Sequence, residues 1–183
     1  MSLQKTDSTI NSLKNILQNK LFPFTTVYIF ILILFSSAKQ FLLGNDIADL
    51  GFFEQFTWLI ANGKLNEPSS LLGRTALEDH FSLLLLPVGL IYKFIPSTYT
   101  LLTLQSISVG LLPSLAAYIS DAKNNTPKIT ISLIIAIALS PYIFLVNLSN
   151  FHPEVIAAPF MLIALNESIQ KRKSIFYLFL LLS

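Results

Sequence analysis

The chain alternates between long apolar runs and short polar segments. Four runs occupy residues 22–38, 98–120, 129–148 and 152–169, and a fifth begins at 174. A helix rises about 1.5 Å per residue and bilayer hydrocarbon is about 30 Å thick, so runs of roughly 20 residues can cross it. The pattern predicts an all-α, polytopic transmembrane helix bundle. Because the run 174–183 stops before it is long enough to span, we expect an N-terminal fragment of a longer protein.

Composition supports a membrane environment. Hydrophobic residues make up 53% of the chain and charged residues 12%, whereas soluble domains carry about 25% charged residues. The net charge is +2 and the basic residues form no single face, so no nucleic-acid partner is expected. The absence of cysteine excludes disulfides, thiolate nucleophiles and cysteine metal ligands. Residues 1–21 are polar with an apolar stripe at helical spacing, which predicts an amphipathic segment on the membrane surface.

The short apolar stretch 81–95 decides the topology. Pro87 interrupts it and Pro96 ends it. If it does not cross, most lysines and arginines that flank the spans lie on the N-terminal side, as the positive-inside rule requires. We therefore expect 81–95 to lie in the outer interface, with the N-terminus cytoplasmic and a first external loop over residues 39–97. The expected location is the bacterial inner membrane.

This loop is predicted to contain two interfacial helices, of which 81–95 is the second. In the first, apolar residues recur every three or four positions, at Ile47, Leu50, Phe53, Phe56 and Ile60, and Asn62-Gly63 is a helix stop. The loop segment 40–80 carries six of the ten acidic residues in the chain. Asp49 falls in the first helical turn, where it either complements the helix dipole or serves as a catalytic carboxylate at the membrane surface.

Two further motifs place ionisable groups on the same side. Asp79-His80 opens the second interfacial helix, and His152-Pro153-Glu154 begins the span 152–169. Each motif can be a helix cap or an interfacial anchor, or it can belong to an acid–base site in which a carboxylate orients an imidazole. Glu54 is a further substrate-binding candidate.

The mixed oxygen and nitrogen donors of Asp49, Asp79 and His152 would also suit a divalent metal such as Mg²⁺ or Mn²⁺. Gln105 and Ser106, which are polar residues within a span, are interpreted as helix-packing groups.

Three motifs in this order carry a family resemblance. They are Asp49-Leu50-Gly51 with Phe53, Gln55 and Trp58, then Asp79-His80-Phe81-Ser82, then Phe151-His152-Pro153-Glu154. The chain resembles the uncharacterised polytopic membrane proteins grouped as domain of unknown function 2079. That family is similar to the C-type glycosyltransferases, which use polyprenyl-phosphate sugars and place an acidic catalytic residue in the first large external loop.

The resemblance implies a membrane glycosyltransferase-like protein that moves a sugar from a polyprenyl phosphate to a hydroxyl acceptor on the external face. It makes Asp49 the catalytic acid–base candidate, with His80 as a second catalytic candidate. An imidazolium or a bound divalent metal would stabilise the departing phosphate. Asp79, His152 and Glu154 would line the site. Three alternatives stay open at this point: a transporter component, a truncated protein without activity, and a structural or assembly protein. Ionisable residues at mid-membrane depth would favour the first, and the sequence has almost none there.

Overall fold

The computed structural model describes residues 2–42, 47–79, 83–122 and 126–181, and this part of the chain folds as helices without a strand. The all-α prediction is therefore confirmed. The helices are α1 (Ser2–Phe41), α2 (Ile47–Ala61), α3 (Ala76–Asp79), α4 (Leu85–Phe94), α5 (Thr98–Ala122), α6 (Pro127–Ala138), α7 (Pro141–Leu148), α8 (Pro153–Ile169) and α9 (Lys173–Leu181).

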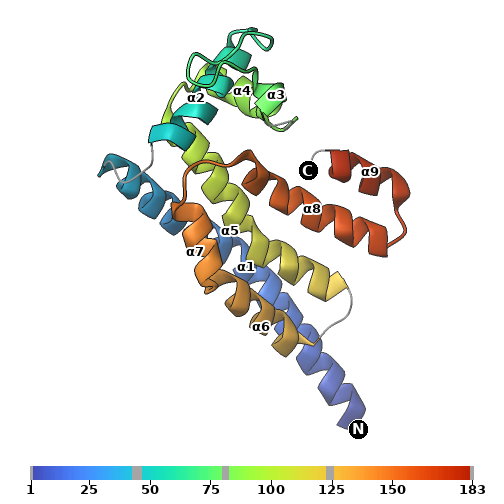
Figure 1. Ribbon diagram of the computed structural model, residues 1–183. Coiled ribbons are helices and arrows are strands. Elements are labelled where there is room, and N and C mark those ends of the chain that lie inside the picture. The colour runs from blue at the N-terminus through green and yellow to red at the C-terminus, as the bar shows by residue number, and fades with distance from the viewer. Residues whose placement is uncertain (1, 43–46, 80–82, 123–125, 182–183) are drawn as a thin grey trace.

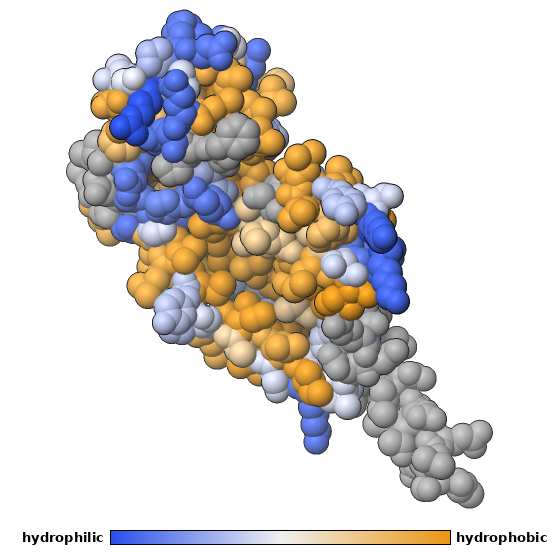
Figure 2. Space-filling view, turned by 45° about the vertical axis from the view of Figure 1, so that its right-hand side comes forward, coloured by the Kyte–Doolittle hydropathy of each residue, from blue (hydrophilic) through white to orange (hydrophobic). Residues whose placement is uncertain are grey.

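Among the described residues, three helical segments are long and apolar enough to cross a membrane, at Leu21–Phe41, Thr98–Asp121 and Pro127–Leu148. They match the first three expected spans. Helix α8 has 17 residues, so it rises about 26 Å, slightly less than the hydrocarbon thickness. The expected spans at 152–169 and from 174 onward remain predictions. Large apolar side chains are exposed along the bundle. Figure 2 shows a largely hydrophobic flank, with hydrophilic residues mainly at the top of the view and at its right-hand edge.

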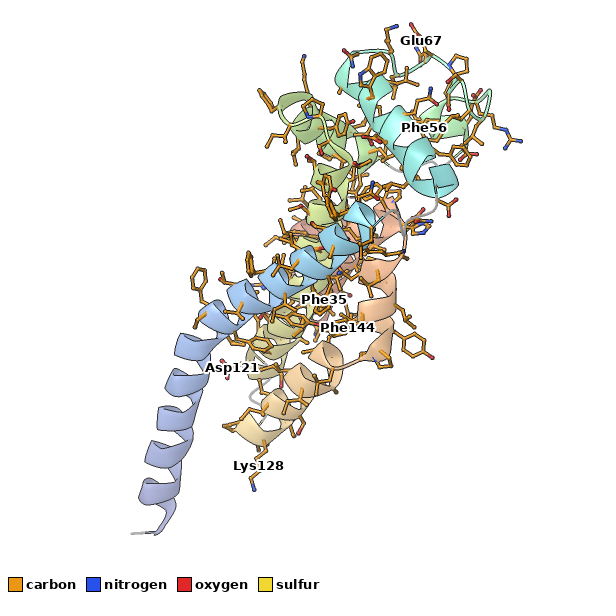
Figure 3. The ribbon with its side chains drawn as sticks, turned by 90° about the vertical axis from the view of Figure 1, so that its left-hand side faces the viewer. Phe35, Phe56, Glu67, Asp121, Lys128 and Phe144 are labelled. Atoms are coloured by element: carbon orange, nitrogen blue, oxygen red, sulfur yellow. The ribbon has the colours of Figure 1, made fainter. Side chains whose placement is uncertain are left out.

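Helix α1 joins two segments that the sequence analysis separated. The expected surface segment 1–21 and the first span run on as one helix of 40 residues, with Pro23 inside it. Proline removes one backbone hydrogen bond and bends a helix without having to end it. Figure 3 shows that α1 changes direction part-way along its length.

The expected span 129–148 is broken into α6 and α7. Pro141 cannot donate to the carbonyl of Ile137, and its ring disfavours helical geometry at the residue before it. Ser140 accordingly takes an extended conformation with ψ of 125°. Pro141 then occupies the first turn of α7, where its missing N–H leaves no internal hydrogen bond unmade.

Helix α5 is the centre of the bundle. It packs against α1, α6 and α8. Gly110 allows a close approach to α1, because a Cβ at this position would lie 3.3 Å from the Cα of Ile29. Phe35 of α1 and Phe144 of α7 meet edge-to-face with ring centroids 6.2 Å apart, as Figure 3 shows.

Helices α2, α3 and α4 form a cap at one end of the bundle (Figure 1). Helix α4 packs against α2 rather than along the bundle, and its 10 residues rise only about 15 Å. One hydrophobic core joins the cap to α5 and to the segment that begins α8, and it includes Phe53, Leu85, Leu101, Phe151 and Ile156.

The predicted stop of α2 at Asn62-Gly63 is confirmed. Gly63 has φ of +72°, Lys64 N–H donates to Leu59 over 2.9 Å, and Gly63 N–H donates to Ile60 over 3.0 Å. This pair of bonds is the Schellman motif, in which glycine takes the left-handed conformation that ends a helix. The stop turns the chain away from the bundle and into the loop that leads to α3.

Candidate functional site

Asp49 lies in the first turn of α2 and faces the turn between α7 and α8. Asn150 Nδ2 donates a hydrogen bond to Asp49 Oδ2 over 3.3 Å. The Asp49 side chain is half-buried. One partner leaves a carboxylate with acceptor capacity, because its two oxygens together offer about four lone-pair sites. Asp49 is thus held in place by Asn150 and can still accept further hydrogen bonds.

The fully buried side chain of Gln105 fixes the α7–α8 turn. Its Nε2 donates to the carbonyl oxygens of Val146 over 3.1 Å and Asn150 over 3.4 Å. Its Oε1 accepts a hydrogen bond from the backbone N–H of His152 over 2.9 Å. Gln105 therefore does more than pack two helices, because it sets the backbone of the segment that approaches Asp49.

Aromatic contacts bring His152 to the same place. Phe53, one helical turn after Asp49, meets Phe151 edge-to-face with ring centroids 5.8 Å apart. The His152 ring lies edge-to-face against Phe53 at 6.0 Å. We call the set Asp49, Phe53, Gln105, Asn150 and His152 the α2–α8 junction. It combines two of the predicted site residues, Asp49 and His152, from segments a hundred positions apart in the sequence.

Glu54 faces a different direction, because five residues along a helix correspond to about 140° of rotation. Tyr92 Oη of α4 donates to Glu54 Oε1 over 2.9 Å. Burial, together with the nearby Glu54 carboxylate, raises the pKa of Tyr92 to about 12. Glu54 borders an open hollow of about 410 Å³ whose other lining residues are Gly51, Gln55, Trp58, Ser70, Leu71 and Tyr92.

The remaining candidates do not join the α2–α8 junction in the described structure. Asp79 pairs with Arg74 across 3.7 Å at the end of α3. Glu154 is exposed in the first turn of α8. His80 lies outside the described residues. The neighbouring Glu78 accepts a hydrogen bond from the Thr75 backbone over 2.8 Å, which lowers the pKa of its carboxyl group.

The described residues contain no group of three or more histidine, aspartate or glutamate side chains placed to hold a metal ion. Asp79 is engaged by Arg74, whereas His152 packs against Phe53. Asp49, Asp79 and His152 therefore do not form a ligand set in the part of the chain that the structure describes.

A groove of about 330 Å³ lies between α4, α5 and α8. Its lining is almost entirely aliphatic or aromatic and includes Val88, Ile91, Leu104, Leu111, Ile156 and Ile163. The Ser108 hydroxyl in this lining donates to the carbonyl of Leu104 over 2.9 Å, so it presents no unsatisfied donor. The groove follows α5 from Leu104 to Leu115, about 16 Å along the helix axis.

The model of one protein family matches residues 42–183, which include the cap, α5 to α9, the junction and the groove. This chain belongs to the DUF2079 family of predicted membrane proteins. The match confirms the resemblance drawn from the three motifs and carries no statement of activity. Searches of curated proteins and of solved structures found no match to the chain.

Three residues of this DUF2079 chain were not identified as site residues from the sequence. Gln105 was interpreted as a packing residue, although a fully polar amide in an apolar span is a recognisable signal for a functional position. Asn150 adjoins the Phe151-His152 motif and was passed over. Nothing in the sequence pairs Tyr92 with Glu54, because the contact depends on how α4 crosses α2.

Proposed function

We propose that this protein is a membrane glycosyltransferase-like protein that transfers a sugar from a polyprenyl phosphate to a hydroxyl acceptor. The observation that carries the proposal is the α2–α8 junction, in which Asn150 holds the Asp49 carboxylate at 3.3 Å. His152 packs on Phe53, one turn along the helix from Asp49. A carboxylate held in position can act as a general base in proton transfer.

In the proposed reaction, the hydroxyl oxygen of the acceptor attacks the anomeric carbon of the donor. Asp49 accepts the proton that this hydroxyl loses. The bond between this carbon and the phosphate oxygen breaks, and the polyprenyl phosphate leaves with the bonding electrons. Positive charge placed at the departing phosphate lowers the barrier. His152 of the junction, or His80 beyond the described residues, would supply this charge as an imidazolium.

The apolar groove supports a lipid-linked donor. A prenyl chain needs a hydrocarbon surface, and the apolar lining of the groove between α4, α5 and α8 provides one. Ile156, which lines the groove near the start of α8, lies one helical turn after His152. A donor chain in the groove would therefore have its phosphate near the end of α8 that carries the junction.

We also propose that the α2–α4 cap faces the outside and that the N-terminus is cytoplasmic. The cap and the start of α6 lie at opposite ends of the bundle, with Glu67 at one end and Lys128 at the other in Figure 3. The α8–α9 turn, which contains Lys171-Arg172-Lys173, lies at the end of α8 that is farther from the cap in Figure 1. Basic residues collect on the cytoplasmic side of membrane proteins.

The test is an in vitro transfer assay with the full-length protein and polyprenyl-phosphate sugars, measuring release of the lipid phosphate. Asp49→Asn preserves the hydrogen bond to Asn150 but removes the base, so the rate should fall about 10²- to 10⁴-fold. Glu67→Gln changes an exposed carboxylate in the neighbouring loop and should leave the rate unchanged. Equal rates for wild type and Asp49→Asn would remove Asp49 from the mechanism. Absence of lipid-phosphate release with every donor would reject glycosyl transfer.

A further inference from the structure

The hollow beside Glu54 is formed by one face of α2. Four residues of α2 line it on one face of the helix, at spacings of three, one and three: Gly51, Glu54, Gln55 and Trp58. Ser70 of the following loop and Tyr92 of α4 close the sides. The volume of about 410 Å³ falls within the range of about 300–1,000 Å³ that is typical of small-molecule sites.

Hydrogen bonds hold the polar groups of the hollow in fixed positions. Gln55 Nε2 donates to Ser70 Oγ over 2.6 Å, and Ser69 Oγ donates to Gln55 Oε1. Ser69 is itself fixed, because its backbone N–H donates to the Arg74 carbonyl over 2.8 Å. The α2 face and the loop are therefore joined before any ligand arrives, which reduces the entropy lost on binding.

Glu54 provides a fixed acceptor. Tyr92, whose side chain is 4% exposed, donates to Glu54 Oε1 from the buried side. This contact uses one lone pair of the carboxylate, so Glu54 can still accept hydrogen bonds from a ligand in the hollow. A tyrosine hydroxyl is protonated at neutral pH, so Tyr92 remains the donor in this contact.

Trp58 provides an exposed aromatic surface, with 45% of its area accessible. Lys64 Nζ lies 5.9 Å from the centroid of the Trp58 rings and is paired with Glu67 over 3.1 Å. Gly51 contributes no side chain, and a Cβ there would reach only Leu71, at 4.0 Å. The floor of the hollow is thus open next to an aromatic surface and a carboxylate.

We propose that this hollow binds a saccharide, through hydroxyl hydrogen bonds to Glu54, Gln55 and Ser70 and stacking of the C–H face of a sugar ring on Trp58. Sugars combine an apolar C–H face with closely spaced hydroxyl donors and acceptors, and the hollow presents the complement of both. A quaternary ammonium ligand fits less well, because such ligands need several exposed aromatic faces. The ring of Tyr92 is buried, so Trp58 is the one exposed aromatic ring in the lining of the hollow.

This inference goes beyond the proposed function. The hollow lies on a different face of α2 from Asp49, and its lining contains no residue of the α2–α8 junction. A saccharide held there would be bound outside the proposed catalytic residues, as an acceptor or product chain extending from them. The binding proposal rests on the contacts of the hollow alone, so it can fail or succeed independently of glycosyl transfer.

Trp58 makes the experiment direct, because it is the single tryptophan of the chain. The protein is purified in a detergent without a sugar or choline headgroup. Glucose, mannose, galactose and N-acetylglucosamine are then titrated while tryptophan emission is recorded. At least one sugar should give a saturable change. Glu54→Gln and Gln55→Leu should each weaken its binding at least 5-fold, whereas the control Lys128→Gln, an exposed position at the opposite end of the bundle, should not.

Saturation-transfer NMR of the same sugars provides a readout that does not depend on Trp58. If Glu54→Gln lowers the melting temperature, Ser70→Ala takes its place, since Ser70 lies in an exposed loop. Absence of saturable binding by both methods for all four sugars overturns the proposal. So does saturation by choline chloride with no response to sugars, which would identify a cation site. Unchanged sugar affinity in Glu54→Gln and Ser70→Ala would likewise overturn it.

Discussion

Gln105 and His152 are 47 positions apart and share a hydrogen bond of 2.9 Å, in which the His152 backbone N–H donates to Gln105 Oε1. The same amide group donates to Val146 and Asn150. One buried residue of α5 therefore determines where α7 ends, where α8 begins and where Asn150 meets Asp49. The position of the proposed catalytic carboxylate depends on this polar contact inside an apolar bundle.

Replacing Gln105 by leucine should destabilise the protein more than an ordinary substitution in α5. The His152 N–H loses its partner, whereas the Val146 and Asn150 carbonyls each keep a hydrogen bond from Ser149. An unsatisfied polar group in the protein interior costs about 1–3 kcal/mol. Thermal unfolding in detergent should show a lower melting temperature for Gln105→Leu. Ser108→Ala is the matched control, because Ser108 bonds only within its own helix at Leu104. Equal melting temperatures for both variants would show that the Gln105 bonds do not stabilise the turn.

The proposed topology can be tested with single cysteines, since this chain has none of its own. Asn66, Lys128 and Lys173 are exposed and lie in the cap loop, at the start of α6 and at the start of α9. In intact cells, an impermeant maleimide should label Asn66→Cys, whereas Lys128→Cys and Lys173→Cys should react only after permeabilisation. The reverse pattern would place the cap, and with it Asp49, in the cytoplasm.

Gly110 should not tolerate a methyl group. A Cβ there approaches the α1 backbone at Ile29 Cα to 3.3 Å, so Gly110→Ala must separate α1 from α5 at a cost of about 1–3 kcal/mol. Gly51→Ala should have the opposite effect, because the nearest atom is 4.0 Å away and alanine stabilises a helix by about 0.5–1 kcal/mol relative to glycine. Unfolding curves should show a lower stability than wild type for Gly110→Ala and a higher stability than wild type for Gly51→Ala. A Gly110→Ala protein as stable as wild type would contradict the close packing of α1 on α5.

The Tyr92–Glu54 contact should make stability depend on alkaline pH. The pKa of Tyr92 is raised to about 12 in the folded state, against about 10 for an unfolded tyrosine. The stabilisation is therefore fully present below pH 10 and is lost as pH rises towards 12. Difference absorbance at 295 nm should show one tyrosine titrating near pH 12 that is missing in Tyr92→Phe. Wild type should lose more stability than Tyr92→Phe between pH 10 and 12, and identical slopes would contradict the contact.

The sequence by itself determined the helical fold, the positions of three apolar helices and the stop of α2 at Asn62-Gly63. These features follow from local properties, namely the length and spacing of apolar residues and the conformational freedom of glycine. The break at Pro141 also has a local cause, although the run 129–148 was interpreted as one span. Local pattern alone also identified Asp49 and His152 as candidates.

Only the tertiary structure decided which candidates lie together. Asp49 meets the segment of His152 because Gln105 fixes a turn more than 40 positions further along the chain. Glu54, five residues after Asp49, points to Tyr92 and the hollow because α4 packs on the other face of α2. Such contacts depend on the angles at which helices cross and on how their side chains pack. The same apolar periodicity is compatible with many crossing angles, so it does not predict these contacts. The amino-acid pattern therefore determines which helix faces are apolar, and the packing of those faces selects the residues of the site.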